Sequence, residues 1–319
     1  MFSFKFIATV PKNNVGCMVL EDRYEITDHG YGKSFVKILH VRKNGLEHTV
    51  KEFEVNTILK LNNQRDYKQG DNRDIVATDT QKNTVYVLAK KHGIVTPEAF
   101  AVLLCKHFLE TYDHIVYVNV KIDESPWERI RKGQDVHNHA FVFKPIALRS
   151  TNVSQTRNVP PVVTSSLTGL RVLKTTQSSF EDFVRDDYTT LPETGDRIFS
   201  TVVDASWVYS THEGVDFNGA WRQVKEAILD NFAGNSQTGI ASPSVQNTLY
   251  LAEQTVLDNV NQISKISMVM PNKHYFNVDF TKFPAQLSAG NKSIEVFQPV
   301  DKPSGLIRAE LSRKGKSKL

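Results

Sequence analysis

The alternation of apolar and polar residues predicts a β-hairpin near the start of the chain. The stretch FVKILHV, from Phe35, alternates with a period of two, and TVKEFEVNTIL, up to Leu61, does so again. Between them lies Lys43-Asn44-Gly45, and Asn-Gly is a dipeptide that tolerates the positive φ angles of a tight hairpin turn. We therefore expect two antiparallel strands joined at Gly45.

A helical period follows at 96–112. Thr96 is a good N-cap, Pro97 suits the first helical position, and Glu98 is favoured in the first turn. Apolar residues then recur every four positions, at Phe100, Leu104, Phe108 and Tyr112. The next segment, IVYVNVKI, alternates instead, so one face of a strand would carry Val116, Val118, Val120 and Ile122. The pattern predicts an amphipathic helix that leads into a strand.

The same order of elements returns in the second half of the chain. Strand-like patterns occupy 167–176 and 196–209. A helix that ends at Gly234 is predicted by Phe217, Trp221, Val224, Ile228 and Phe232. Ser242-Pro243 resembles the start of another helix, whose apolar stripe comprises Val245, Leu249, Ala252, Val256, Val260 and Ile263. The stretches ISMVM and HYFNVDF then have the pattern of strands.

This repetition indicates an internal duplication of the pattern strand, strand, helix, helix, strand. By symmetry, TVYVLA at 84–89 is assigned to the first helix of the first half, although its residues have strand propensity. We expect an α+β fold in which each half places its helices on one face of an antiparallel sheet. The expected segments are an N-terminal extension at 1–24, domains at 25–155 and 156–310, and a tail at 311–319. Such one-sided sheets need their edges covered, and oligomerisation into a barrel would do so.

The composition indicates an ordinary globular protein without nucleic-acid or membrane partners. The chain has 319 residues, 40% of them hydrophobic, and a formal net charge of only +4. Part of that charge lies in the tail at 313–318, so a small anion suits the protein better than nucleic acid. The two cysteines, Cys17 and Cys105, are too few for a disulfide framework or a thiolate metal site. The sequence has no apolar run long enough to predict a membrane span, and no convincing signal peptide.

The last three residues, Ser317, Lys318 and Leu319, form the S-K-L tripeptide that a peroxisomal import receptor binds. The tripeptide follows a polar, basic run that a receptor could reach. The alternative interpretation is a solvated charged tail without a receptor. We expect a peroxisomal location, with the import receptor as a partner.

Local motifs leave the reaction open. His137 and His139 would project to the same side of a strand, as two metal ligands could, but two ligands are too few for a zinc or copper site. Partly buried or interface histidines are therefore the favoured interpretation. The sequence lacks G-x-G-x-x-G after a strand, the P-loop motif and the G-x-S-x-G elbow, so nucleotide cofactors and serine acyl transfer have no support.

A more specific indication comes from YGK (31–33), VATDTQKNT (76–84), TTQSSFEDFVRDDYTTLPETGDRIFST (175–201), SPSVQNTLY (242–250) and PNKHYF (271–276). In order and spacing these stretches resemble urate oxidase, and the similarity extends from about Tyr24 to Leu319. The resemblance implies two tandem tunnelling-fold (T-fold) domains per subunit. It also implies that subunits pair into a wide β-barrel and form a homotetramer, with active sites at the subunit interfaces.

The resemblance further implies a set of substrate-binding residues. Arg197 would bind the anionic edge of urate with its planar guanidinium, and Gln246 would bind the opposite lactam edge with its amide. Phe180 would stack on the ring, and the backbone N–H groups of Val245 and Asp79 would add anion contacts at helix starts. Asn272 would hold molecular oxygen or the attacking water. Taken one at a time, most of these residues have an equally simple structural explanation.

The implied catalytic residues are Lys33, Thr78 and His274, which would form a proton relay. The bound urate anion would lose a second proton and then reduce oxygen itself, so that neither a metal nor another cofactor is required. The expected products are 5-hydroxyisourate and hydrogen peroxide. Two alternatives remain open: a catalytically inactive purine-binding protein of the same fold, and a metal-dependent oxidase that uses His137 and His139.

Overall fold

The computed structural model describes residues 24–284 and 295–314. The expected N-terminal extension, apart from Tyr24, and the tripeptide Ser317-Lys318-Leu319 lie outside the described residues. The strands are β1 (Tyr31–Asn44), β2 (Glu47–Leu61), β3 (Ile115–Glu124), β4 (Trp127–Lys132), β5 (Asp135–Phe143), β6 (Leu148–Thr156), β7 (Val162–Lys174), β8 (Phe199–Tyr209), β9 (Ile263–Asn277) and β10 (Phe297–Ser312). The helices are α1 (Arg65–Gln69), α2 (Thr78–His92), α3 (Pro97–Thr111), α4 (Phe217–Ala233) and α5 (Val245–Asn259), with a 3₁₀ turn η1 (Phe280–Lys282).

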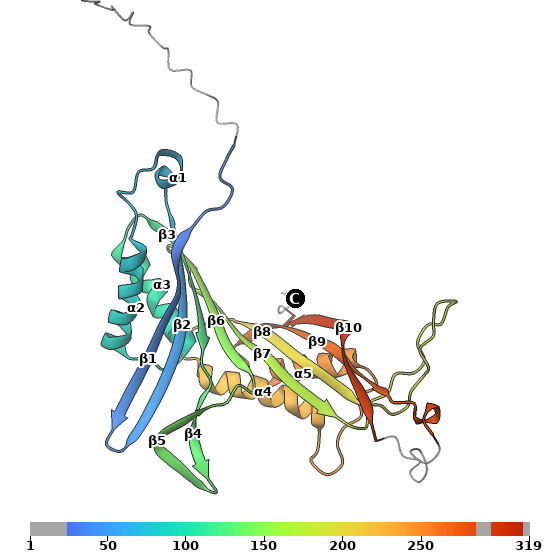
Figure 1. Cartoon of the computed structure of the whole chain (residues 1–319). Helices are drawn as coiled ribbons and strands as arrows, with labels where there is room; N and C mark the ends of the chain where they lie inside the picture. Colours follow the sequence, from blue (N-terminus) through green and yellow to red (C-terminus); the bar gives the residue numbers. More distant parts are fainter. Residues whose placement is uncertain (1–23, 285–294, 315–319) are drawn as a thin grey trace, which may run out of the picture.

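Eight strands form one antiparallel sheet in the order β1-β2-β3-β6-β7-β8-β9-β10, and β4 and β5 form a separate hairpin. The long sheet bends between its two halves, and all the long helices follow its outer side (Figure 1). In the described part of the chain, β1 and β10 are therefore the two edges of the sheet. None of the described helices is long and apolar enough to cross a membrane.

The predicted duplication is present. Each half contains a strand pair, two long helices and two further strands, and the chain passes from one half to the other between β6 and β7. The predicted boundary near 155 falls at the end of β6, yet the sheet continues across it. At the other boundary, β10 continues to Ser312, past the predicted domain end at 310.

The ambiguous segment at 84–89 is helical, as the symmetry argument predicted. It lies in the middle of α2, where Gln81, Val85, Leu88 and Ala89 are buried at helical spacing. Tyr86 and Val87, which raise its strand propensity, are exposed. Burial of one helical face has outweighed local propensity here.

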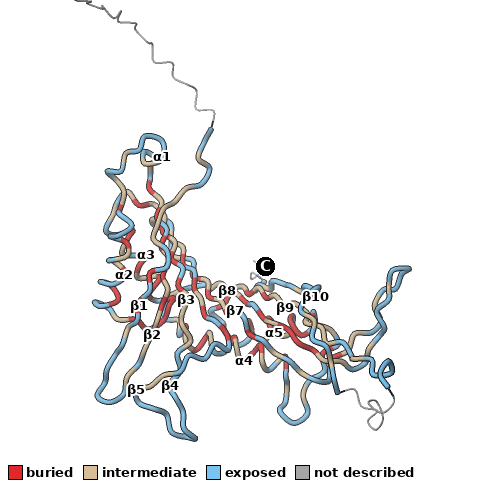
Figure 2. Tube along the Cα trace, in the orientation of Figure 1, coloured by how far each residue is buried: buried red, intermediate tan, exposed pale blue. Residues whose placement is uncertain are grey.

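The hydrophobic core lies between the sheet and its helices, along the segments coloured as buried in Figure 2. In the first half the core includes Val55, Leu59, Leu104, Phe108, Val118 and Ile122. In the second half it includes Val203, Trp207, Ile228, Ala252, Ile266 and Met268. Each strand contributes alternate residues to this layer, which fixes the face on which its remaining side chains lie.

The start of α5 differs from the prediction. Ser244, not Ser242, is the N-cap, and its side chain accepts a hydrogen bond from the N–H of Asn247. Ser242 is extended and pairs with Ser178, as expected for a residue that precedes proline. The end of the predicted apolar stripe was also wrong, because α5 stops at Asn259 and Ile263 begins β9.

Candidate active site

The residues predicted to bind or act on a ligand fall into two sets, one in each half of the fold. The first set, from β1 and α2, comprises Lys33, Thr78 and Asp79. The second set, from β9, α5 and the segment between β7 and β8, comprises Phe180, Arg197, Val245, Gln246, Asn272 and His274. Separate hydrogen bonds and packing contacts hold each set in place.

Lys33 lies near the start of β1, just before a bulge in its pairing with β2. Its N–H donates to the Thr57 hydroxyl at 3.3 Å. The preceding residue must be glycine, because a Cβ on Gly32 would lie 1.6 Å from the carbonyl oxygen of Thr57. The glycine of the YGK motif therefore permits a close approach of β1 to β2 next to the lysine.

A buried chain of polar groups connects this strand pair to the start of α2. The Thr57 hydroxyl donates to Gln81 Oε1 at 2.8 Å, and Gln81 Nε2 donates to the carbonyl oxygen of Val76 at 3.1 Å. The Val76 N–H in turn donates to the Tyr31 hydroxyl at 2.8 Å. The segment that carries Thr78 is thus held beside β1. Sequence reasoning did not identify Thr57 or Gln81, since only their tertiary contact reveals their role.

Thr78 and Asp79 are the first two residues of α2 rather than residues before it, and Ala77 is the N-cap. N–H groups in the first turn of a helix have no partner within the helix, so they face outward. The Asp79 carboxylate does not cap them: it accepts from Lys82 Nζ at 2.5 Å and Asn83 Nδ2 at 3.0 Å. The Lys82 ammonium lowers the pKa of Asp79, with a smaller contribution from the charge of Lys33.

Arg197 has the features of an anion-binding residue. Its N–H donates to the Ser178 carbonyl at 2.8 Å, which fixes its backbone, and its guanidinium lies 5.3 Å from the centroid of the Phe180 ring. Burial lowers the pKa of Arg197, and no carboxylate of the described residues forms an ion pair with it. A partly buried guanidinium without an acidic partner is costly unless an anion binds to it.

Phe180 is held by backbone hydrogen bonds with Thr194, at 2.9 and 3.2 Å. Its ring already stacks on that of Phe183, with 4.9 Å between centroids and 11° between planes. One face of Phe180 is therefore covered by another aromatic ring. A flat ligand that stacks on Phe180 would therefore use the opposite face of its ring.

Val245 and Gln246 are the first two residues of α5, so their N–H groups are at the positive end of that helix. Pairing of Ser242 with Ser178 places this helix start next to the segment that carries Phe180. Val245 is buried, whereas Gln246 is exposed in the single chain. The structure therefore brings the predicted arginine and glutamine to the same end of the second half.

Asn272 and His274 lie two residues apart on β9 and share one face of the strand. The helix α5 packs on β9 and is antiparallel to it, so the start of α5 lies beside a later part of the strand. The 15 residues of the helix span ~22 Å, which equals the length of about seven strand residues counted from Ile263. The start of α5 therefore lies near Asn272. The ring of His274 stacks on Phe276, with 5.8 Å between centroids.

The two sets lie near opposite edges of the sheet. Six strand spacings separate β1 from β9, or roughly 29 Å along the sheet. A relay of Lys33, Thr78 and His274 is therefore not assembled within one chain. Figure 1 shows the same separation, with α2 in one arm of the bent molecule and the ends of β9 and β10 in the other.

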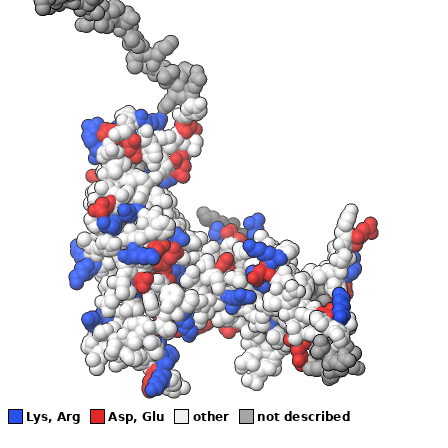
Figure 3. All heavy atoms as spheres, in the orientation of Figure 1, with Lys and Arg blue, Asp and Glu red and all other residues white. Residues whose placement is uncertain are grey.

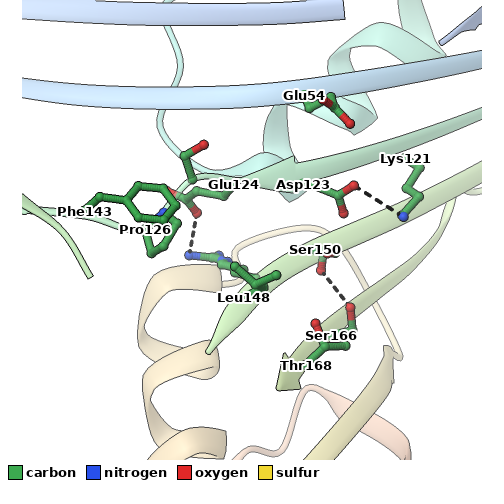
Figure 4. Close-up of a pocket in the computed structure, with 12 residues that line it drawn as sticks. Glu54, Lys121, Asp123, Glu124, Pro126, Phe143, Leu148, Ser150, Ser166 and Thr168 are labelled. Carbon is green, nitrogen blue, oxygen red and sulfur yellow. Dashed lines mark hydrogen bonds and ion pairs between the residues drawn. The ribbon is translucent and has the colours of Figure 1, made fainter. Parts of the chain in front are cut away.

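A cavity of about 470 Å³ at the junction of the two halves is lined by neither set. Its charged groups are largely paired: Lys121 lies 3.3 Å from Asp123, and Arg149 lies 3.6 Å from Glu124 (Figure 4). The surface around the junction carries both signs of charge without a large patch of either (Figure 3). This cavity is not the predicted site.

His137 and His139 both lie on β5, and their rings are 4.7 Å apart. They are exposed, so the expectation of partial burial was wrong for the single chain; an interface role stays a prediction. His48 lies 5.6 Å from His139, but His137 Nδ1 accepts the N–H groups of His139 and Ala140. The described residues contain no group of three or more His, Cys, Asp or Glu side chains that could hold a metal ion.

Comparisons with known proteins give a consistent result. The uricase family model matches residues 29–154 and 163–308, and the gap between the two matches coincides with the turn between β6 and β7. The chain is 51% identical to a uricase of Drosophila melanogaster, over 95% of this chain and 94% of that protein. It is 45% identical to a uricase of Danio rerio, over 92% of this chain and 97% of that protein.

Solved structures agree with the described fold. The crystal structure of uricase from Arthrobacter globiformis superimposes with a TM-score of 0.83 and is 35% identical, covering 92% of this chain and 96% of that one. A uricase from Bacillus fastidious has the same fold, with a TM-score of 0.74 at 22% identity. The two-domain T-fold predicted from the sequence is thus confirmed, and the chain belongs to the uricase family.

Proposed function

We propose that the chain is an active urate oxidase that converts urate, oxygen and water to 5-hydroxyisourate and hydrogen peroxide. Family membership supports the substrate class, since relatives 44% to 53% identical are uricases. The observation that carries the proposal is the Arg197 guanidinium, which is partly buried, has no acidic partner among the described residues, and lies 5.3 Å from the Phe180 ring centroid. An anionic, flat, aromatic ligand fits this combination.

In this proposal urate is bound between Arg197 and Gln246. The guanidinium would donate two parallel hydrogen bonds to the anionic edge of the purine, and the Gln246 amide would both donate to and accept from the opposite edge. Phe180 would stack on the ring, while the N–H of Val245 would contribute the positive end of α5. A flat ligand is then fixed in one orientation.

A second copy of the chain would supply the first set of residues. The described edges of the sheet, β1 and β10, carry unpaired backbone groups, and their pairing between copies would close a barrel. That arrangement would place Lys33, Thr78 and Asp79 of one copy beside the second set of another. We propose that two copies close one barrel in this way, and that two such dimers stack to form the homotetramer that the resemblance implies.

The proposed chemistry begins with proton transfer. The N–H of Asp79 would stabilise a urate nitrogen anion, and the Thr78 hydroxyl, Lys33 and His274 would remove the second proton. Asn272 would hold oxygen and, later, the attacking water. The urate dianion would then reduce oxygen directly, and water would add a hydroxyl group to the oxidised ring, so that the overall equation balances with one hydrogen peroxide released.

Arg197→Gln tests the proposal, and Arg185→Gln is its matched control. The Arg185 guanidinium also lies 5.3 Å from an aromatic centroid, that of Phe183, but outside the proposed site. We expect Arg197→Gln to lower kcat/KM for urate by about 100-fold or more and Arg185→Gln to change it less than about threefold. Equal effects of the two substitutions would refute the assignment.

The same assay separates the alternatives. Loss of urate absorbance is followed in buffer treated exhaustively with a chelator. Continued turnover supports the proposed reaction, whereas a loss of turnover that added metal restores supports a metal-dependent oxidase. Binding of urate without turnover indicates a purine-binding protein.

We also propose a peroxisomal location, supported by Ser317-Lys318-Leu319 and by the need to contain hydrogen peroxide. The test is the distribution of the chain fused at its N-terminus to a fluorescent protein. Peroxisomal fluorescence should be lost when Leu319 is removed. A diffuse signal from the unaltered fusion would contradict the proposal.

A further inference from the structure

The last residue of β7, Lys174, reaches across to the segment that precedes α5. Its Nζ donates to the carbonyl oxygen of Ile240 and to the Ser242 hydroxyl, both at 2.8 Å. The residues joined by these two bonds are 66 and 68 positions away in the sequence. Lys174 thus connects a strand of the sheet to the loop that leads into α5.

The surroundings of this ammonium group favour a fixed position. It lies 5.9 Å from the Phe199 ring centroid and 5.6 Å from that of Phe232. Burial lowers the pKa of Lys174, and none of the described carboxylates forms an ion pair with it. Its charge is stabilised by a carbonyl, a hydroxyl and two aromatic faces, and hydrogen bonds from a charged donor are stronger than neutral ones.

Ser242 connects this lysine to the first turn of α5. The Ser242 hydroxyl also accepts from Thr248 Oγ1 at 2.8 Å, and both residues are buried. Thr248 lies one turn into the helix that begins with Val245 and Gln246. Movement of Ser242 would therefore move the helix start that carries Gln246.

Ser242 is also connected to Arg197, which together with Gln246 forms the proposed ligand clamp. Its N–H donates to the Gln177 carbonyl at 2.9 Å, and its carbonyl accepts the Ser179 N–H at 3.0 Å. Between them, the Ser178 carbonyl accepts the Arg197 N–H. One residue thus participates in holding both ends of the clamp, and Lys174 donates to its only side-chain oxygen.

We propose that Lys174 is a positioning residue that sets the separation between Arg197 and Gln246, and thereby the affinity for a flat oxopurine. The proposal rests on the proposed function, because it concerns the same clamp. Lys174 acts through Ser242 and the first turn of α5. Lys174 takes no part in removing the proton from urate, a step that the proposed function assigns to Lys33, Thr78 and His274.

Lys174→Met tests this role because it keeps most of the side-chain volume and removes the donors. We expect KM for urate to rise about tenfold while kcat stays within about threefold, since the clamp loosens and the relay is unchanged. The affinity for xanthine, measured by calorimetry, should fall by a similar factor. Lys225→Met is the matched control, because Lys225 Nζ lies 5.2 Å from the Trp221 centroid on α4, and it should leave both values unchanged.

Chemical rescue distinguishes positioning from a general loss of folding. Lys174→Cys is prepared in a Cys17→Ser background and treated with 2-bromoethylamine, which rebuilds an ammonium at nearly the original length. The remaining Cys105 is buried and burial raises its thiol pKa to about 12, so it should not react. We expect the treatment to restore KM and xanthine affinity.

Ser242→Ala provides an independent route to the same answer. If Lys174 acts through this hydroxyl, Ser242→Ala should also raise KM for urate. The KM of the double variant, Lys174→Met with Ser242→Ala, should then be less than twofold above the higher KM of the two single variants. Unchanged KM in folded Lys174→Met, a fall in kcat alone, or failure of the alkylated protein to recover would each overturn the proposal. Absence of urate turnover in the wild type would instead refute the proposed function, while xanthine affinity would still measure the clamp.

Discussion

Glu253 makes the stability of the protein depend on pH in an unusual direction. This residue lies on the buried face of α5, and neither carboxylate oxygen has a hydrogen-bond partner in the described structure. Burial raises its pKa to about 7 from the ordinary 4.5. Repulsion from Glu310 adds to the rise, whereas the nearby N–H of Met268 opposes it.

The size of the effect follows from this pKa. Each pKa unit corresponds to about 1.4 kcal/mol, so a rise from 4.5 to about 7 amounts to roughly 3 kcal/mol. Below about pH 4.5 the carboxyl group is protonated in both the folded and unfolded states, and this stability is fully present. As the pH rises toward about 7 the unfolded chain releases its proton first, so the folded state loses stability progressively.

This loss can be measured by denaturant unfolding of the wild type and Glu253→Gln. Both proteins are unfolded at about pH 5.5 and at about pH 8.5, at the same protein concentration. The wild type should lose about 2 kcal/mol more than the variant over this range, because glutamine cannot ionise. Glu226→Gln, at an exposed position of α4, is the control and should behave as the wild type. Parallel pH profiles of the wild type and Glu253→Gln would refute a neutral buried carboxyl group.

Two further predictions concern Lys33 and the glycine that precedes it on β1. In steady-state assays, Lys33→Met should lower kcat for urate about 100-fold with little change in KM. The control is Lys37→Met, at an exposed position of the same strand, which should leave kcat unchanged. Gly32→Ala should destabilise the fold by roughly 2–4 kcal/mol in denaturant unfolding, because its Cβ would meet the Thr57 carbonyl; wild-type stability would mean that β1 can move away.

Short-range signals predicted much of the fold correctly. The turn between β1 and β2 is at Gly45, as predicted, although its two central residues are Gly45 and Leu46 and Asn44 is the last residue of β1. Thr96 caps α3 by accepting the N–H of Ala99. These features depend on neighbouring residues only, so they can be inferred from the local sequence. The start of α5 was misplaced because Ser242 and Ser244 have the same capping chemistry. Only pairing with Ser178, which comes from tertiary structure, decides between them.

The candidate site was predicted position by position from a family resemblance, and local patterns alone did not indicate it. The residues that hold it in place, Thr57, Gln81 and Lys174, were not found. Each acts through a partner far away in sequence, such as the hydroxyl of Ser242 for Lys174. An isolated threonine, glutamine or lysine is usually a surface residue. Nothing in the neighbouring sequence marks Thr57 and Gln81 as buried or Lys174 as partly buried.

The placement of the two residue sets near opposite sheet edges has a genetic consequence in the proposed assembly. Each reaction centre would draw on two polypeptides, so an allele lacking Lys33 and an allele lacking Arg197 would damage different sides of it. Assemblies that contain both variant polypeptides would have some active sites in which one chain supplies an intact Lys33 and the other an intact Arg197. Two alleles that are inactive alone would then complement each other when expressed together.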